Sequence, residues 1–230
     1  MRAIIDLSQP LHEGMTVCEG HPPFTLSQCC TLERDGSAVS LLSLSSHTGT
    51  HLDAPAHFIE GGATVDELDL SALIGPVLVV DARGREPDAT LDWDDTFAPY
   101  AKAFAPGIAV AICTGWSQHW GTPMYARNPR VAPAAAARLF EAGVRLLCID
   151  ALSPDGAPDT ERGESHDNWH RFHLFWLGKG GMIVENLISA GLEKMLDHED
   201  RGASWMGSFL PLRLEKCDGS PVRAIAWREV

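Results

Sequence analysis

The sequence lacks a long apolar run, an excess of positive charge and any closely spaced cysteine pair of the C-x-x-C type. No stretch of its 230 residues approaches the roughly 18 apolar residues of a transmembrane helix, which argues against a membrane-spanning protein. Lysine and arginine number 18 against 31 acidic residues, which gives a formal charge of −13. Neither nucleic acid nor an anionic membrane is therefore an expected partner, because both require a basic surface.

Secretion signals and disulfide frameworks are also missing. The first residues, MRAIIDLSQPLHEG, include an acid at the sixth position and show neither a long apolar core nor a small-residue cleavage site. Two of the six cysteines, Cys113 and Cys148, lie in apolar, strand-like runs and are expected to be small buried hydrophobes. A chain of this length does not need disulfide bonds for stability. These features predict a cytoplasmic protein.

Short apolar, β-branched segments recur along the chain and predict a mixed α/β fold. Strands are expected at residues 3–7, 39–44, 76–80, 108–113, 144–149 and 181–184. One helix is expected to begin at Pro133 and to end near Gly143, so residues 108–150 form a β-α-β unit. A composition of 45% hydrophobic and 21% charged residues, without repeats or low-complexity tracts, predicts one domain over residues 1–230.

Two further patterns are local. Thr64 and Glu67 have capping-box spacing for a short helix that would stop near residues 75–76. Near the C-terminal end, apolar segments at 209–214 and 222–227 flank Asp218-Gly219, which predicts a β-hairpin.

The strongest chemical signal is a histidine-rich run at residues 47–58, HTGTHLDAPAHF. It holds four potential ligands: His47, His51, Asp53 and His57. Imidazole and carboxylate groups suit Zn²⁺ or Mn²⁺, provided that several converge on one point. The alternative is a surface loop that happens to be rich in histidine; four potential ligands at such short spacing favour a metal site.

The spacing within this run favours extended or turning backbone. His51 and Asp53 are two residues apart, so in a strand both side chains leave the same face. Residues 48–50 are threonine, glycine and threonine, which have poor helix propensity. Pro55 would end strand pairing and turn the chain, so that His57 approaches from another direction.

The run resembles the signature of the cyclase family of metal-dependent hydrolases, which includes bacterial kynurenine formamidases and isatin hydrolases. Every fixed position of the pattern His-x-Gly-Thr-His-x-Asp-x-Pro-x-His is met. Further similar segments follow in family order: IIDLSQPL, VDELDLSALIGPVLVVDAR, CTGWSQHWG, residues 144–155, and IVENL at 183–187. The resemblance covers nearly the whole chain. It implies a mixed β-sheet rolled into a barrel-like core with flanking helices, in a homodimer or homotetramer.

The resemblance also implies a set of metal ligands: His47, His51, Asp53, His173 and Glu185. The first three would hold one divalent metal, with Asp53 able to bridge to a second that the last two complete. One or two ions are expected, Zn²⁺ first and Mn²⁺ as the alternative. The residues themselves support Glu185, because a carboxylate that follows the apolar run 180–184 is costly to bury unless it is paired or bound to metal.

By the same resemblance, His57 would be the general acid/base. A divalent metal lowers the pKa of bound water and polarises a carbonyl, and a histidine can take up and return the proton that hydrolysis moves. The expected function is cleavage of a C–N bond in a small amide, aryl formamide or cyclic amide. A lactonase or dehydrating cyclase using the same site is the enzymatic alternative. The non-enzymatic alternative is a metal-binding protein without catalysis, which would have a closed site.

Substrate contacts are the least defined part of the site. Formamidases of the family share a Trp-Pro-Gly-Asp segment where this chain has Cys18-Glu19-Gly20-His21, so the aromatic wall is absent at Cys18 and the substrate stays open. His21 is a candidate because this segment helps to form the pocket in relatives. Trp116 would either wall an aromatic pocket or pack in the core.

Asp150, Asp155 and His170 are given ordinary structural roles. Asp150 and Asp155, near the end of an expected strand, are interpreted as turn residues. His166, His170 and His173 have spacings of four and three, which would place them on one face of a helix. His170 is interpreted as an exposed or half-buried histidine rather than as a partner of the site.

Overall fold

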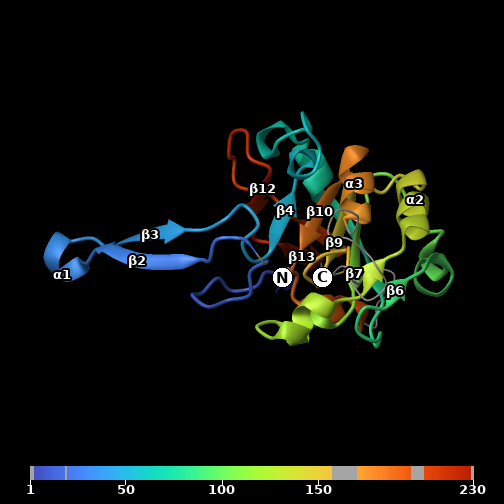
Figure 1. Ribbon diagram of the computed structural model, residues 1–230, viewed down its shortest axis with the longest axis horizontal. Helices are drawn as coiled ribbons and strands as arrows, with labels where there is room; N and C mark the ends of the chain where they lie inside the picture. Colours follow the sequence, from blue (N-terminus) through green and yellow to red (C-terminus); the bar gives the residue numbers. More distant parts are fainter. Residues whose placement is uncertain (1–2, 19, 157–169, 198–204, 229–230) are drawn as a thin grey trace.

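Short apolar segments from the middle of the chain form the parallel centre of a curled, mixed sheet (Figure 1). The computed structural model describes residues 3–18, 20–156, 170–197 and 205–228. Within these residues the sheet has nine strands in the order β1-β13-β11-β5-β7-β9-β10-β4-β12. Their bounds are β1 Ala3–Asp6, β4 His51–Asp53, β5 Ile74–Asp81, β7 Ala109–Cys113, β9 Leu146–Ile149, β10 Met182–Glu185, β11 Trp205–Ser208, β12 Gly219–Pro221 and β13 Ile225–Arg228.

Strands β5, β7, β9 and β10 are parallel, and the strands on both sides of them are antiparallel. The expected β-α-β unit is confirmed: α2 (Pro133–Glu141) connects β7 to β9, and these strands are parallel neighbours. Proline stands at the start of α2, and Gly143, with a φ of 94°, follows its end. The mixed α/β fold expected from the sequence is confirmed.

The remaining helices are short. They are α1 Leu32–Asp35, α3 Arg171–Gly178 and α4 Ser189–Leu196. Single turns of 3₁₀ helix lie at Pro55–His57, Val65–Glu67, Leu70–Leu73, Ala98–Tyr100, Trp116–His119 and Pro123–Arg127, and a π-helical turn lies at Trp93–Phe97. None of the helices in the described part of the chain has the length and hydropathy that a membrane span requires.

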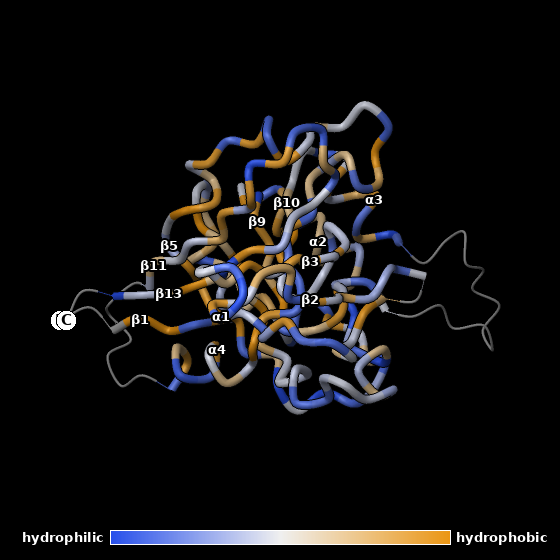
Figure 2. The backbone as a smooth tube through the Cα atoms, turned by 90° about the vertical axis from the view of Figure 1, so that its left-hand side faces the viewer, coloured by the Kyte–Doolittle hydropathy of each residue, from blue (hydrophilic) through white to orange (hydrophobic). Residues whose placement is uncertain are grey.

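Two hydrophobic clusters cover the faces of the sheet. Alternate residues of β7 and β9 belong to different clusters, because successive side chains of a strand point to opposite faces. Helices α2 and α3 contribute to one cluster and α4 to the other. Cys113 and Cys148 are buried in the second cluster, as the sequence predicts. The hydrophobic segments, orange in Figure 2, gather in the body of the molecule around the sheet.

Two local predictions need correction. The capping box of Thr64 and Glu67 is present, but it caps a single 3₁₀ turn, and residues 75–76 lie inside β5. Asp218-Gly219 is not the turn of a regular hairpin: the two flanking segments meet at the isolated antiparallel bridge Pro211↔Val222, but β12 begins at Gly219 and pairs with β4, whereas β13 pairs with β11 and β1. The Asp-Gly signal describes only local backbone, so it cannot reveal pairing with a strand more than 160 positions earlier.

The alternation of apolar and small polar residues at 39–44 predicts a half-buried strand, but β3 (Val39–Ser43) is exposed throughout. It pairs with β2 (Thr25–Cys30), and α1 lies between them. Residues 25–43 project from the body (Figure 1). A second short pair, β6 (Thr90–Leu91) with β8 (Arg130–Val131), lies in the body. Alternating hydrophobicity predicts a strand correctly, but it does not reveal whether another layer covers either face.

Candidate metal and catalytic site

The histidine-rich run folds as its spacing predicts. A turn over residues 46–50 carries His47, and β4 is buried and presents His51 and Asp53 on one face. Pro55 begins a 3₁₀ turn that ends at His57 and brings its ring back beside the ring of His47, with 3.8 Å between centroids. Strand β10 pairs with β4 so that Glu185 lies opposite His51.

Two of the histidines have their Nδ1 atoms occupied by fixed acceptors. His51 Nδ1 lies 2.8 Å from the carbonyl oxygen of Gly49, and His173 Nδ1 lies 2.7 Å from Asp155 Oδ2. A carbonyl and a carboxylate can only accept, so each Nδ1 donates its proton. In the neutral rings, Nε2 then carries a lone pair, which is the form that binds a metal.

These two Nε2 atoms face a pair of carboxylates. The His51 nitrogen lies 3.3 Å from Asp53 Oδ1 and 3.4 Å from Glu185 Oε2. The His173 nitrogen lies 3.5 Å from Asp53 Oδ2 and 3.3 Å from Glu185 Oε1. Four ligands placed tetrahedrally at about 2.0–2.1 Å from a zinc ion would stand roughly 3.3–3.4 Å from one another. Each histidine nitrogen is thus about this far from one oxygen of Asp53 and one of Glu185, and the two histidines face different oxygens of each carboxylate.

Burial and neighbouring charges shift the pKa values of both carboxylates in the quartet of His51, Asp53, His173 and Glu185. Asp53 Oδ2 and Glu185 Oε1 are buried and have no hydrogen-bond partner among the described residues. Burial, together with the charge of Asp53, raises the pKa of Glu185. Burial also opposes ionisation of Asp53, but the neighbouring histidines outweigh it and hold the pKa of Asp53 well below its usual value. Burial would lower the pKa of His173, but its contacts with Asp155, Asp53 and Glu185 outweigh burial and raise that pKa well above its usual value, so without a metal this ring carries the positive charge that a bound divalent cation would supply.

His47 lies on the other side of Asp53, between two carboxylates. Its Nδ1 is 2.8 Å from Asp53 Oδ1 and its Nε2 is 2.7 Å from Asp218 Oδ2. Burial would lower the pKa of His47, but the two acids outweigh burial and raise it to about 9. All five expected ligands are thus brought together. They form two groups that share Asp53, one with His47 and His51 and one with His173 and Glu185, and the ligand atoms within each group lie within 4.8 Å of one another.

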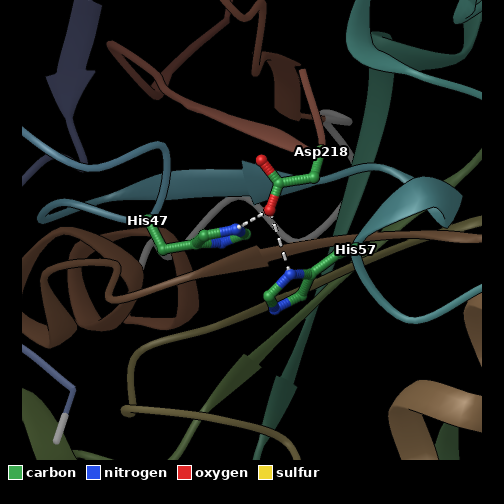
Figure 3. Close-up of side chains that lie close together, drawn as sticks. All are labelled: His47, His57 and Asp218. Carbon is green, nitrogen blue, oxygen red and sulfur yellow. Dashed lines mark hydrogen bonds and ion pairs between the residues drawn. The ribbon is translucent and has the colours of Figure 1, made fainter. Parts of the chain in front are cut away.

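His57 shares the acceptor of His47. Its Nδ1 lies 3.2 Å from Asp218 Oδ2, and both rings are directed at that carboxylate (Figure 3). Burial lowers the pKa of His57 to about 4, so the ring is neutral at pH 7. Donation from Nδ1 to Asp218 leaves Nε2 as a proton acceptor. The neutral ring of His57 is therefore placed to accept a proton at Nε2, as a general base must.

Asp218 reaches the site because β12 pairs with β4. Gly219 lies opposite Asp53 in this pairing, and a Cβ at Gly219 would be 2.7 Å from Cε1 of His47 and 2.9 Å from the carbonyl oxygen of Leu52. The absence of a side chain therefore lets His47 lie against the strand. Burial acts to raise the pKa of Asp218, but its contacts with His47 outweigh burial and hold that pKa well below its usual value.

A cavity of about 240 Å³ opens onto these residues. Cys18 and His21 line it, as the sequence predicts, and so does the half-buried His170. Trp116 does not reach its wall. That ring is buried in the core, where its Nε1 donates to the carbonyl oxygen of Tyr125 at 3.1 Å. His166 lies outside the described residues.

Sequence reasoning missed three residues of the site. Asp155 and Asp218 were interpreted as turn residues, yet each accepts a hydrogen bond from a site histidine. The position of Asp155, beyond the carboxyl end of the parallel strand β9, is a signal that could have found it, because ligands bind at that edge of such sheets. No local signal marks Asp218. Trp120 lines the cavity, four residues after the tryptophan that was proposed.

The chain is similar to proteins of known family over most of its length. The Cyclase family model matches residues 5–156, which is more than half of the chain. The chain belongs to the cyclase family. The resemblance recognised in residues 47–58 is therefore confirmed. A kynurenine formamidase of Paracidovorax citrulli is 33% identical over 226 residues, covering 97% of this chain and 96% of its own. Another, from Bacillus cytotoxicus, is 31% identical over 227 residues, with 96% and 95% covered.

Solved cyclase-family structures share the fold. Isatin hydrolase A from Ralstonia solanacearum gives a TM-score of 0.83 at 21% identity, covering 99% of this chain and 92% of that one. A protein from Bacillus stearothermophilus described as a predicted metal-dependent hydrolase gives 0.74 at 26% identity, covering 99% and 98%. Together with the formamidase relatives, these matches identify the chain as an enzyme of the metal-dependent amidohydrolase class.

Proposed function

We propose that this enzyme hydrolyses the C–N bond of a small aryl formamide or cyclic amide, and that Asp53, His173 and Glu185, with His47 and His51 on the other side of Asp53, hold its one or two metal ions. The observation that carries the proposal is the pair of buried carboxylate oxygens, without hydrogen-bond partners among the described residues, that face Nε2 of His173 beside a cavity. The names of the formamidase and isatin hydrolase relatives support the reaction class. Zn²⁺ is the first expectation and Mn²⁺ is the alternative, because both accept imidazole and carboxylate ligands.

When bound, a divalent metal supplies Lewis acidity that strengthens water as a nucleophile and polarises the carbonyl under attack. The protein contributes the proton transfers. His57 Nε2 takes a proton from the water that adds to the carbonyl carbon, and the same proton passes to the nitrogen as the C–N bond breaks. Asp218 holds the His57 ring through Nδ1 and stabilises its protonated form. His47 is the candidate ligand for a second ion on the Asp218 side.

The cavity supports an aromatic substrate although tryptophan is missing at Cys18. Phe58 and Trp120 supply aromatic surface at its wall. The buried Nε1 of Trp120 has no acceptor among the described residues, so it is free to donate to a substrate carbonyl. The volume is below the range of about 300–1,000 Å³ that is common for drug-sized ligands, which favours a molecule of one or two rings.

The test combines metal analysis with a substrate panel. Purified protein should contain stoichiometric zinc or manganese by mass spectrometry and should hydrolyse an aryl formamide or isatin faster than a lactone. His57→Ala should lose activity and retain metal, whereas His12→Ala, at an exposed histidine, should keep both. Metal-free protein with undiminished activity would overturn the proposal. Preference for the lactone would favour the lactonase or cyclase alternative, and bound metal with no turnover of any substrate would favour a non-catalytic protein.

A further inference from the structure

Asn186, directly after Glu185, is a buried residue of the cavity wall with an unusual backbone conformation. Its φ is 60°, a left-handed value that glycine adopts more readily than any residue with a side chain. Its backbone N–H donates to the carbonyl oxygen of Ala151 at 3.0 Å, which joins this position to the segment after β9. A glycine would satisfy these backbone requirements, so the asparagine side chain points to a further role.

The side-chain amide of Asn186 lies between a tyrosine and the turn that carries His47. Its Nδ2 donates to the carbonyl oxygen of Gly49 at 2.9 Å, and its Oδ1 accepts from the hydroxyl of Tyr125 at 2.8 Å. This orientation of the amide is fixed, because the Gly49 oxygen can only accept. Tyr125 is 1% exposed, and burial, with the nearby acidic groups, raises its pKa well above the usual value. Its hydroxyl therefore keeps its proton and donates.

The same Gly49 oxygen holds Nδ1 of His51, at 2.8 Å. A carbonyl oxygen has two lone pairs, so it accepts from both side chains at once. Nδ2 of Asn186 also lies 3.4 Å from Nδ1 of His51, but this contact is the longer one. Without a proton, Nδ1 would face the Gly49 oxygen as a second acceptor and be repelled. A proton on Nδ1 is therefore favoured, and in the neutral ring the lone pair is then on Nε2, toward Asp53 and Glu185.

The backbone of Asn186 holds the same turn at the next residue. The hydroxyl of Thr50 donates to the Asn186 carbonyl oxygen at 2.6 Å, and it accepts from the backbone N–H of Gln9 at 2.8 Å. Residues 49 and 50, which lie between His47 and His51, are thus both bonded to position 186. The bond at residue 50 needs only backbone at position 186, whereas the bond at residue 49 needs the asparagine amide.

We propose that Tyr125 and Asn186 are positioning residues for the metal ligand His51. The phenol orients the amide, the amide holds the Gly49 carbonyl, and that carbonyl fixes the ring with Nε2 toward the metal site. This role rests on the proposed function, because it takes His51 as a metal ligand. A ring that is oriented in advance loses less freedom when the metal binds, so these bonds raise metal affinity. Tyr125 also packs edge-on against Trp120, with 5.1 Å between ring centroids, so one buried tyrosine supports both the aromatic wall and His51.

Chelator competition on the full-length, zinc-loaded protein tests the proposal without reference to turnover. Asn186→Gly keeps a backbone that adopts the left-handed φ and removes the amide, so it should weaken zinc binding about 10- to 100-fold. Tyr125→Phe removes the hydroxyl and should weaken zinc binding about 3- to 10-fold. Trp116→Phe is the matched control, because it removes a bond to the Tyr125 carbonyl oxygen and leaves the hydroxyl in place. Its zinc affinity should equal that of wild type.

Proton NMR of the imidazole N–H groups in the zinc-loaded protein distinguishes positioning from a general loss of stability. In Asn186→Gly the Nδ1–H of His51 should exchange faster with water, whereas the Nδ1–H of His173, held by Asp155, should be unchanged. If circular dichroism shows that Asn186→Gly does not fold, Tyr125→Phe decides by the same two measurements. Unchanged zinc affinity in the folded variants, or equal acceleration of both N–H signals, would overturn the positioning role alone. A wild type that binds no zinc would overturn the zinc site of the proposed function as well.

Discussion

Asp218 Oδ2 lies 2.7 Å from Nε2 of His47, although 171 positions separate the two residues in the chain. The same oxygen lies 3.2 Å from Nδ1 of His57. One carboxylate therefore connects the histidine beside the metal quartet with the histidine proposed to transfer protons. It contacts both rings from the residue immediately before β12 (Figure 3).

Asp218→Asn should lower kcat by about 10- to 100-fold with little change in KM, because the neutral amide neither fixes the tautomer of His57 nor stabilises its protonated ring. Steady-state kinetics on the best substrate of the panel measures the change. Asp94→Asn, at an almost fully exposed carboxylate, is the control and should behave as wild type. An unchanged kcat in Asp218→Asn would exclude this role.

Asp155→Asn should weaken metal binding by about 10- to 100-fold, because an amide nitrogen facing His173 Nδ1 would move the ring proton to Nε2, the atom that faces the quartet. Competition with a chelator measures the affinity. The carboxylate also accepts the backbone N–H groups of Phe172 and His173 at the start of α3. Asn can keep one such bond, so stability should fall by no more than about 1–2 kcal/mol. Unchanged affinity would contradict the tautomer argument.

Glu185→Gln separates metal binding from folding. In metal-free protein the substitution should raise the melting temperature, because it removes one of two adjacent buried charges; each kcal/mol corresponds to about 2–4 °C for a chain of this size. Added zinc, which should stabilise wild type strongly, should stabilise the variant far less. Thermal unfolding with and without zinc gives both values. A lower melting temperature in the metal-free variant would mean that the two carboxylates do not repel each other there.

The two neighbouring tryptophans should respond differently to substitution. Trp120→Leu should raise KM for an aryl formamide by about 10-fold, because it removes aromatic surface from the cavity wall. Trp116→Phe should leave KM unchanged and lower stability by about 0.5–1.5 kcal/mol through loss of the bond to Tyr125. Kinetics and thermal unfolding of both variants distinguish the roles. Equal effects of the two substitutions on KM would contradict the assignment of Trp120, and not Trp116, to the cavity wall.

The parts of the site that the sequence reveals are those coded by neighbouring residues. His51 and Asp53 share a face because they are two apart in a strand, and Pro55 turns the chain toward His57. The contribution of Asp218 depends instead on the pairing of β12 with β4, which no local pattern encodes.

The same limit applies to burial. The spacing of apolar residues predicts β3 and α2 equally well, yet only α2 is covered within the chain. Likewise, composition cannot tell which of two tryptophans four residues apart faces the cavity, because that depends on the path of the 3₁₀ turn Trp116–His119. His173 and Glu185 were identified by resemblance to a family. Glu185 approaches Asp53 because β10 pairs with β4, whereas His173 approaches it from α3.

The position of β4 between β10 and β12 sets an order for assembly during synthesis. The first three histidines leave the ribosome long before Glu185, and Asp218 follows later still. An ion captured by residues 47–57 alone is held by an incomplete set of ligands and can exchange with the surrounding pool. We therefore expect metal selectivity to be set after β10 and β12 have paired with β4, when Glu185 and Asp218 have reached the site.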